Sequence, residues 1–121
     1  MAYDDQNIFA KILRGEIPCN KVYEDEYALA FYDIAPQAPC HILVIPKGAY
    51  VSMDDFTQNA PEALIVGYIR AVGHIAREAG VQETGYRIIA NHGQDSRQEV
   101  PHLHIHILAK RDLGGLLSSN S

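Results

Sequence analysis

Residues 102–108 read His-Leu-His-Ile-His-Ile-Leu, and this stretch decides how the whole sequence is interpreted. Histidines and aliphatic residues alternate along it, and successive side chains of a β-strand point to opposite faces of a sheet. The three histidines, His102, His104 and His106, therefore share one face of a predicted strand over residues 102–109. Neighbouring histidines on that face would stand about 6.5–7 Å apart, close to the span of a phosphate group. The aliphatic face is expected to pack against a long helix.

The histidine face is interpreted as a functional site rather than as core. Each ring must satisfy two nitrogens, and three charged rings in a row would repel one another. Two chemistries fit. One is a zinc site with several histidine ligands. The other is a neutral imidazole, with an ordinary pKa of about 6.5, that attacks phosphorus and forms a covalent intermediate. Further metal ligands would be expected nearby in the sequence, and Glu99 is the one such candidate, so the nucleophile is favoured.

The rest of the chain predicts an α+β fold, in which an antiparallel sheet of about five strands carries one long helix and one short N-terminal helix. The short helix follows Asn7, a favoured N-cap residue. The long helix begins near Pro61, repeats apolar residues every 3.6 positions and ends at Gly80. The expected strands cover residues 21–24, 28–32, 41–45, 86–91 and 102–109. Residues 92–99 are expected to form a polar loop.

Composition bounds the class of protein. The 121 residues are read as a single domain with a core over about residues 7–117 and a flexible C-terminal tail. Ten Lys and Arg against 15 Asp and Glu give a net charge of -5, which argues against non-specific nucleic-acid binding. The polar residues 1–6 do not resemble a signal peptide, and no apolar run approaches a membrane span of about 18 residues. Two cysteines, Cys19 and Cys40, fit a reducing cytoplasm.

The histidine stretch resembles the His-φ-His-φ-His-φ-φ signature of the histidine triad superfamily, where φ is an apolar residue. The likeness continues through residues 8–18 and 24–47 and covers about residues 7–117. It points to the Hint-like branch of nucleotide-binding purine phosphoramidases more than to the dinucleoside polyphosphate hydrolases. The resemblance implies a homodimer whose sheet continues across the interface. It also implies that the tail at residues 113–117 reaches the partner's site.

The resemblance assigns roles to the three histidines. His104 would be the nucleophile that takes the nucleotidyl group, while His102 and His106 would bind the α-phosphate oxygens and orient it. His41 would stand behind the triad. The predicted reaction is a double displacement on a nucleoside 5′-phosphoramidate or a related phosphoanhydride, and it releases the nucleoside monophosphate.

The resemblance also assigns a nucleotide-binding set. Asp33 would accept hydrogen bonds from the ribose hydroxyls, a task that suits a carboxylate. Asn91 and the backbone N–H of Val100 would contact the phosphate. Glu99 stands where Hint-like relatives usually carry Ser or Thr, so it either points away from the phosphate or handles a cationic or protonated leaving amine. The apolar walls of the base pocket would come from Ile8, Phe9, Ile12, Ile17, Phe31, Ile34 and Leu43.

No metal or other cofactor is expected. Many relatives bind zinc through Cys-x-x-Cys near the N-terminus, and those positions are Asn7 and Ala10 here. The expected ligand is a purine nucleotide such as AMP or GMP. Three alternatives remain open: a nucleotide-binding regulatory protein with incidental hydrolysis, a dinucleoside polyphosphate hydrolase, and a histidine-based metalloprotein.

Overall fold

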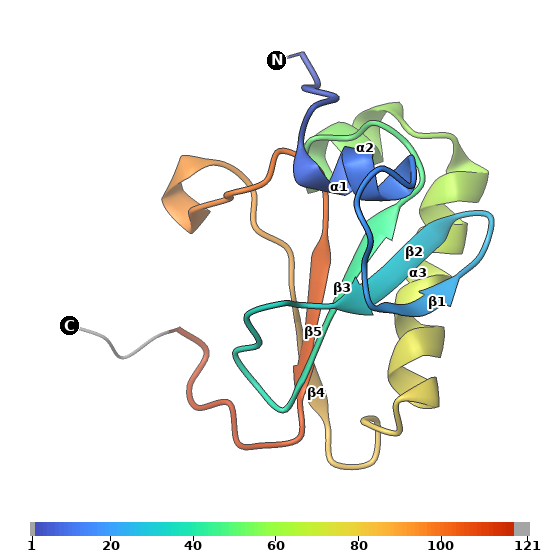
Figure 1. The fold of residues 1–121 in the computed structure, drawn as a ribbon. Helices are drawn as coiled ribbons and strands as arrows, with labels where there is room; N and C mark the ends of the chain where they lie inside the picture. Colours follow the sequence, from blue (N-terminus) through green and yellow to red (C-terminus); the bar gives the residue numbers. More distant parts are fainter. Residues whose placement is uncertain (1, 118–121) are drawn as a thin grey trace.

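A computed structural model describes residues 2–117 of the chain and shows an antiparallel five-stranded sheet in the order β1-β2-β3-β5-β4 (Figure 1). The α+β prediction is confirmed. The elements in chain order are α1 (Ile8–Leu13), β1 (Lys21–Glu24), β2 (Ala28–Tyr32), β3 (Cys40–Pro46), α2 (Met53–Asn59), α3 (Glu62–Glu78), β4 (Tyr86–Ile89), the 3₁₀ turn η1 (Gln94–Ser96) and β5 (Ile105–Ala109).

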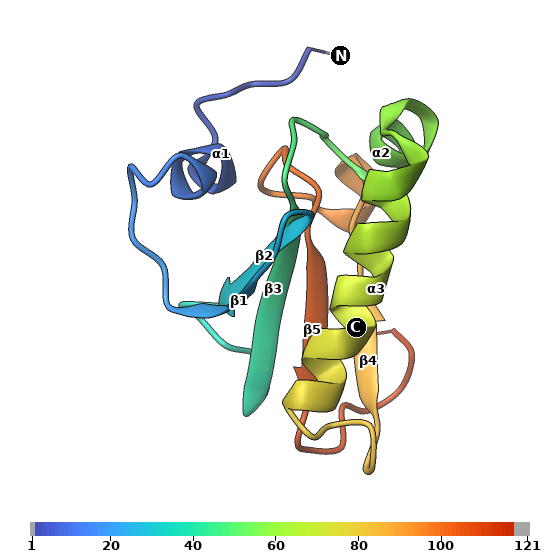
Figure 2. The ribbon, with the colours of Figure 1, turned by 90° about the vertical axis from the view of Figure 1, so that its right-hand side faces the viewer.

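Helices cover the sheet on both faces. The long helix α3 lies along one face together with α2, and the short helix α1 lies over the other (Figure 2). The larger apolar core lies on the α3 side and includes Tyr68, Ile75 and Ile107. A smaller core lies beneath α1, around Phe9 and Phe31. The central strand β3 is buried along its whole length, as its continuous apolar run requires.

The last strand is shorter than the sequence predicts. It begins at Ile105, so His102 and His104 lie in the segment that leads into β5. That segment is held by a turn from the His102 N–H to the Val100 carbonyl (2.9 Å) and by a bond from the Leu103 N–H to the Tyr50 carbonyl (2.8 Å). These bonds replace ladder pairing at this end of the strand. The expected packing of Leu103, Ile105 and Ile107 against the long helix is confirmed, because all three belong to the larger core.

Helix ends follow the predicted chemistry, and one helix was not predicted. The Asn7 side chain accepts a hydrogen bond from the Ala10 N–H (2.9 Å) at the start of α1. Gly80 follows α3 with a φ of +73°, a conformation that favours glycine. Helix α2 is missing from the sequence prediction because it is short and buries only Phe56, too little to show a helical period.

Two further predictions concern the ends of the chain and the membrane. Within residues 2–117, no helix is both long and apolar enough to cross a membrane. The expected flexible tail falls partly on residues 118–121, which lie outside the described part of the chain.

Candidate active site

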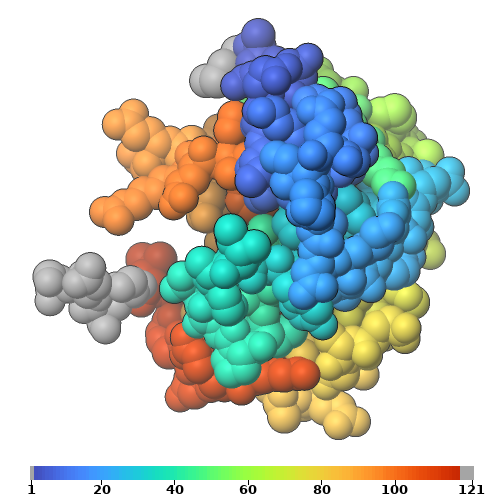
Figure 3. All heavy atoms as spheres, in the orientation of Figure 1, coloured from blue at the N-terminus to red at the C-terminus, as the bar shows by residue number. Residues whose placement is uncertain are grey.

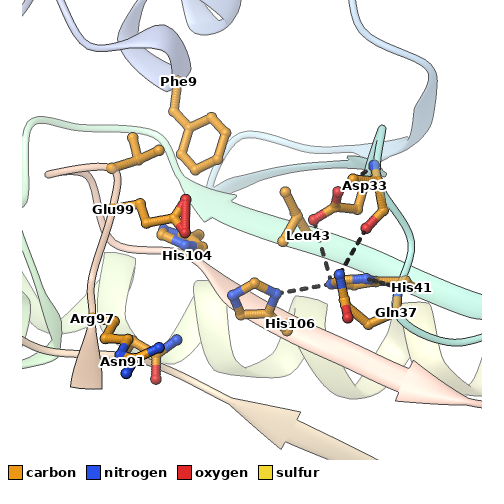
Figure 4. Close-up of a pocket in the computed structure, with 12 residues that line it drawn as sticks. Phe9, Asp33, Gln37, His41, Leu43, Asn91, Arg97, Glu99, His104 and His106 are labelled. Atoms are coloured by element: carbon orange, nitrogen blue, oxygen red, sulfur yellow. Dashed lines mark hydrogen bonds and ion pairs between the residues drawn. The ribbon is translucent and has the colours of Figure 1, made fainter.

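A pocket of about 380 Å³ opens on the α1 side of the sheet. Its mouth is the hollow between the blue helix α1, the teal segment after β2 and the orange loop before β5 (Figure 3). Side chains from segments that lie far apart in the sequence converge here (Figure 4). The lining residues are Phe9, Asp33, Ala35, Gln37, His41, Leu43, Asn91, Arg97, Glu99, Val100, His104 and His106.

His104 presents an unprotonated nitrogen to this pocket. Its Nδ1 lies 2.7 Å from the carbonyl oxygen of His102, and because a carbonyl only accepts, Nδ1 must carry the ring proton. Burial lowers the pKa of His104 below its usual value, and the ring is therefore neutral at pH 7. Its Nε2, on the opposite side of the ring, keeps a lone pair and has no protein partner within the described residues. Phe9 meets this ring edge-on, with 4.9 Å between the ring centroids.

His106 presents a proton beside that lone pair. The Gln37 N–H donates to Nδ1 of His41 (3.0 Å), so a neutral His41 carries its proton on Nε2. That Nε2–H donates to Nδ1 of His106 (2.9 Å). Burial, with smaller contributions from His104 and His41, lowers the pKa of His106 to about 4. The single proton of this neutral ring is therefore on Nε2, where the ring can donate to a ligand.

His102 is not brought into the pocket. Its ring is fully buried, and burial lowers its pKa to about 4. Both nitrogens are taken by protein atoms, Nε2 by the Pro46 carbonyl (3.3 Å) and Nδ1 by the Tyr3 hydroxyl. The expected contact between this ring and an α-phosphate oxygen has no support in this arrangement. His102 instead contacts His104 through its carbonyl oxygen.

The loop between β4 and β5 forms the outer wall. Asn91, Arg97, Glu99 and Val100 all line the pocket, and Arg97 adopts a left-handed backbone with a φ of +59°. The Glu99 side chain lines the same pocket as His104 (Figure 4), and its charge acts on the His104 ring, so of the two expectations for Glu99 the one in which it points away is not met.

A residue that the sequence reasoning missed fastens this loop. The Gln98 side chain donates to the carbonyls of Val51 (2.7 Å) and Val100 (3.1 Å) and accepts from the Gly93 N–H (3.0 Å). A glutamine in a polar loop carries no sequence signal of such cross-linking. Tyr3 was missed for the same reason, because 99 residues separate it from His102.

The predicted apolar wall is only partly assembled. Phe9 and Leu43 line the pocket, whereas Phe31 is buried behind them in the smaller core. Ile34 is 98% exposed in the loop after β2. A six-residue helix turns one narrow face to the site, and Phe9 occupies it. The remaining predicted wall residues that do not line the pocket are Ile8, Ile12 and Ile17.

Asn7, which stands at a position where the resemblance led us to look for a metal-binding cysteine, has a structural task. Asn7 caps α1 with its side chain, and neither Asn7 nor Ala10 carries sulfur. Elsewhere in the described residues, Asp33, His41 and His106 bring possible ligand atoms within 4.8 Å of one another. Nε2 of His41 is hydrogen bonded to Nδ1 of His106 (2.9 Å) and lies 3.4 Å from a carboxylate oxygen of Asp33. The expectation of a site without metal stays a prediction.

Comparisons with known proteins agree with this geometry. A family model described as the HIT domain matches residues 14–113. An uncharacterized 13.2 kDa HIT-like protein of Azospirillum brasilense is 66% identical over 116 residues, 96% of this chain and 95% of that protein. The purine nucleoside phosphoramidase of Escherichia coli K12 is 42% identical over 114 residues, 94% of this chain and 95% of that one. A histidine triad protein structure from Clostridium difficile superposes with a TM-score of 0.81 at 46% identity, covering 95% of this chain and 98% of its own.

Proposed function

This chain belongs to the HIT-domain family, and from that premise we propose that it hydrolyses a purine nucleoside 5′-phosphoramidate or a related phosphoanhydride through a nucleotidyl-histidine. The observation that carries the proposal is the free Nε2 lone pair of His104, which lies beside the Nε2–H of His106 at the base of one pocket. A nucleophile and a hydrogen-bond donor placed side by side suit attack on a phosphoryl group.

In the first step, Nε2 of His104 attacks the α-phosphorus and the bond from phosphorus to the leaving nitrogen breaks. The imidazolium that forms is stabilised by the bond from Nδ1–H to the His102 carbonyl. His106 donates its Nε2–H to a phosphoryl oxygen as negative charge develops there. The leaving amine keeps the bonding electron pair and takes a proton that Glu99, which reaches both the pocket and solvent, relays from solvent.

In the second step, water attacks the phosphorus of the nucleotidyl-histidine. Its proton passes to the Glu99 carboxylate, the bond from phosphorus to Nε2 breaks, and the nucleoside monophosphate leaves with His104 neutral again. One water is consumed, and the proton that Glu99 gives in the first step returns in the second. Apart from the His102 carbonyl and the attacking water, the groups that act in these two steps line the pocket.

The remaining pocket residues hold the nucleotide. Asp33 lines the pocket near His41, and its carboxylate accepts hydrogen bonds from the ribose hydroxyls. Asn91 and the Val100 N–H bind phosphoryl oxygens from the loop side. Phe9 and Leu43 supply apolar surface for the purine. We place the reaction in the cytoplasm, where Cys19 and Cys40 stay reduced.

We also propose that the protein works as a homodimer joined through β4 and α3. β4 is an edge strand of the sheet, and Ile88 on it is 52% exposed. Tyr86, two residues earlier, lies on the same face of the strand and is also exposed. On α3, Val66 is 51% exposed and Ile69 nearly as much. An apolar edge strand is a template for pairing with another chain. A second copy that pairs edge to edge would extend the sheet and cover both apolar sets.

The test is turnover of an adenosine 5′-phosphoramidate, followed as AMP release, with the adenylyl adduct sought by intact-protein mass spectrometry. His104→Ala is expected to abolish AMP release and adduct formation while AMP still binds. His74→Ala is the matched control, because His74 packs against Tyr23 on the opposite face of the sheet. Wild-type-like turnover by His104→Ala would refute the mechanism. A guanosine phosphoramidate and a diadenosine polyphosphate run in parallel separate the base and leaving-group alternatives, and binding without turnover would identify a regulatory protein.

A further inference from the structure

The N-terminal segment reaches the deepest histidine of the triad. The Tyr3 hydroxyl is hydrogen bonded to Nδ1 of His102, and the two rings meet edge-on with centroids 5.7 Å apart. Tyr3 lies before residues 14–113, the part of the chain that the family model matches. The contact therefore links the N-terminal segment ahead of α1 to the histidine segment near the other end of the chain.

Hydrogen bonds hold the N-terminal segment in place. The Gln6 N–H donates to the Asp4 carboxylate (2.9 Å), and the Asn7 side chain donates to the Asp4 carbonyl (2.7 Å). The Arg14 guanidinium donates to the Asp5 carbonyl (2.8 Å). These bonds tie residues 4–7 to helix α1 and its end, so Tyr3 approaches His102 from a fixed base.

His102 needs a donor at Nδ1. The Pro46 carbonyl faces Nε2 and can only accept, so the proton of the neutral ring must stand on Nε2. Nδ1 then holds a lone pair inside a fully buried site, where an unmatched acceptor costs free energy. Within the described residues, the Tyr3 hydroxyl is the side-chain donor that meets it. Burial raises the pKa of Tyr3, which keeps this hydroxyl protonated.

The bond matters to the reaction through the backbone of His102. The His102 carbonyl accepts the Nδ1–H of His104 (2.7 Å), which leaves Nε2 of His104 free to attack. Residues 102–104 lie outside the strand, so the sheet ladder does not fix this carbonyl. Its position depends on the bonds that hold the His102 ring and its neighbours.

We propose that Tyr3 is a positioning residue: its hydroxyl fixes the tautomer and ring orientation of His102, and the His102 carbonyl in turn directs the attacking nitrogen of His104. The proposal rests on the proposed function for its kinetic consequence, but its structural part stands without a substrate. Tyr3 acts through His102 and touches no group that reacts.

The experiment compares wild type with Tyr3→Phe, which removes one oxygen atom and keeps the ring. In protein labelled with ¹⁵N-histidine, the wild-type His102 signals should show a pure Nε2–H tautomer with a hydrogen-bonded Nδ1. In Tyr3→Phe the Nδ1 signal should shift to that of an unbonded acceptor or to a tautomer mixture. With the phosphoramidate substrate, kcat should fall about 3- to 10-fold, the effect of one lost hydrogen bond, and KM should change less than twofold.

Tyr23→Phe is the matched control, because it also removes a hydroxyl, in this case one bonded to Asp25 (2.8 Å). It should leave both the His102 signals and kcat unchanged, and melting temperatures of both variants verify that they fold. An unchanged His102 spectrum in Tyr3→Phe, or an unchanged kcat despite an altered spectrum, overturns the proposal. If wild type turns over no phosphoramidate, the proposed function fails, while the spectra alone still decide whether Tyr3 sets the tautomer.

Discussion

Nε2 of His41 lies 2.9 Å from Nδ1 of His106 across neighbouring strands β3 and β5. The two residues are not direct partners in the ladder, since His41 is opposite Leu108 and His106 is opposite Leu43. Their rings meet diagonally on the face that carries the pocket. The backbone N–H of Gln37 donates to Nδ1 of His41, so the proton of His41 is on Nε2 and is donated to Nδ1 of His106. The proton of His106 is therefore on its Nε2.

Replacing His41 should therefore remove the Nε2–H donor of His106 while the other residues that line the pocket stay in place. In His41→Ala, Nδ1 of His106 loses its partner, and the proton can move from Nε2 to Nδ1, away from the substrate. We expect kcat for the phosphoramidate to fall about tenfold or more, with a smaller change in KM. Steady-state kinetics measure both. Gln37→Ala is the control, because its backbone N–H remains, and it should retain nearly full activity. Equal losses in the two variants would contradict this account.

The neutral histidines should make the fold sensitive to acid. Burial lowers the pKa of His102 and His106 to about 4, below the value near 6.5 of the unfolded chain. Between these values the unfolded chain binds more protons, so the free energy of unfolding rises with pH and is lost as pH falls from about 6.5 to about 4. For His102 the loss amounts to about 3 kcal/mol at the acid end.

Calorimetric melting temperatures across this pH range check that slope. His106→Asn removes one of the titrating rings and should show a shallower decline than wild type. His74→Asn should follow the wild-type curve. A melting temperature that stays constant from pH 7 to pH 4 would show that these rings are not held neutral by burial.

Glu99 should separate the two chemical steps. In Glu99→Gln the side chain can no longer relay a proton, so release of an amine from a phosphoramidate should slow by about 10- to 100-fold. With an adenosine phosphoanhydride whose leaving group needs no proton, the first step should persist while hydrolysis slows. The adenylyl adduct of His104 should then accumulate, as intact-protein mass spectrometry can show. Glu26→Gln, at the exposed turn between β1 and β2, should behave as wild type. Unimpaired phosphoramidate turnover by Glu99→Gln would remove Glu99 from the mechanism.

A charge on the edge strand should dissociate the proposed dimer. Ile88→Asp places a carboxylate in the middle of β4, where a second copy would pair, and burying it there is costly. Size-exclusion chromatography with light scattering should report a dimer for wild type and a monomer for this variant. Ile34→Asp, which places the same charge on an exposed isoleucine in the loop after β2, should remain dimeric. A wild-type mass of one chain would refute the dimer directly.

The sequence predicts the sheet well because its signals are local. Alternation, caps and turn residues foretell the strands and the two ends of α3, and Asn7 caps α1 as its residue type suggests. Helix α2 is not predicted because its packing depends on a single buried residue, Phe56. The shortened β5 escapes because the bonds that replace its ladder come from Tyr50 and Val100, which no periodicity connects to it.

The sequence predicts the residue types of the site but not the hydrogen bonds that connect them. Three histidines at alternate positions announce chemistry, yet only His104 and His106 line the pocket. The withdrawal of His102 depends on Tyr3 and on the Pro46 carbonyl, partners that lie far away in the sequence. Such long-range bonds follow from how the chain packs and leave no mark on local patterning.

Because β5 begins at Ile105, the two rings of the proposed mechanism stand on backbone that is held in different ways. His106 is clamped in the ladder between β3 and β4, whereas His104 sits on a segment tied down by single bonds. A ring that forms and breaks a bond to phosphorus has to advance and retreat, and a ring that stabilises charge works best when it stays still. In the proposed mechanism, the less constrained segment therefore carries the ring that bonds to phosphorus, His104. The strand carries the ring that only donates a hydrogen bond, His106.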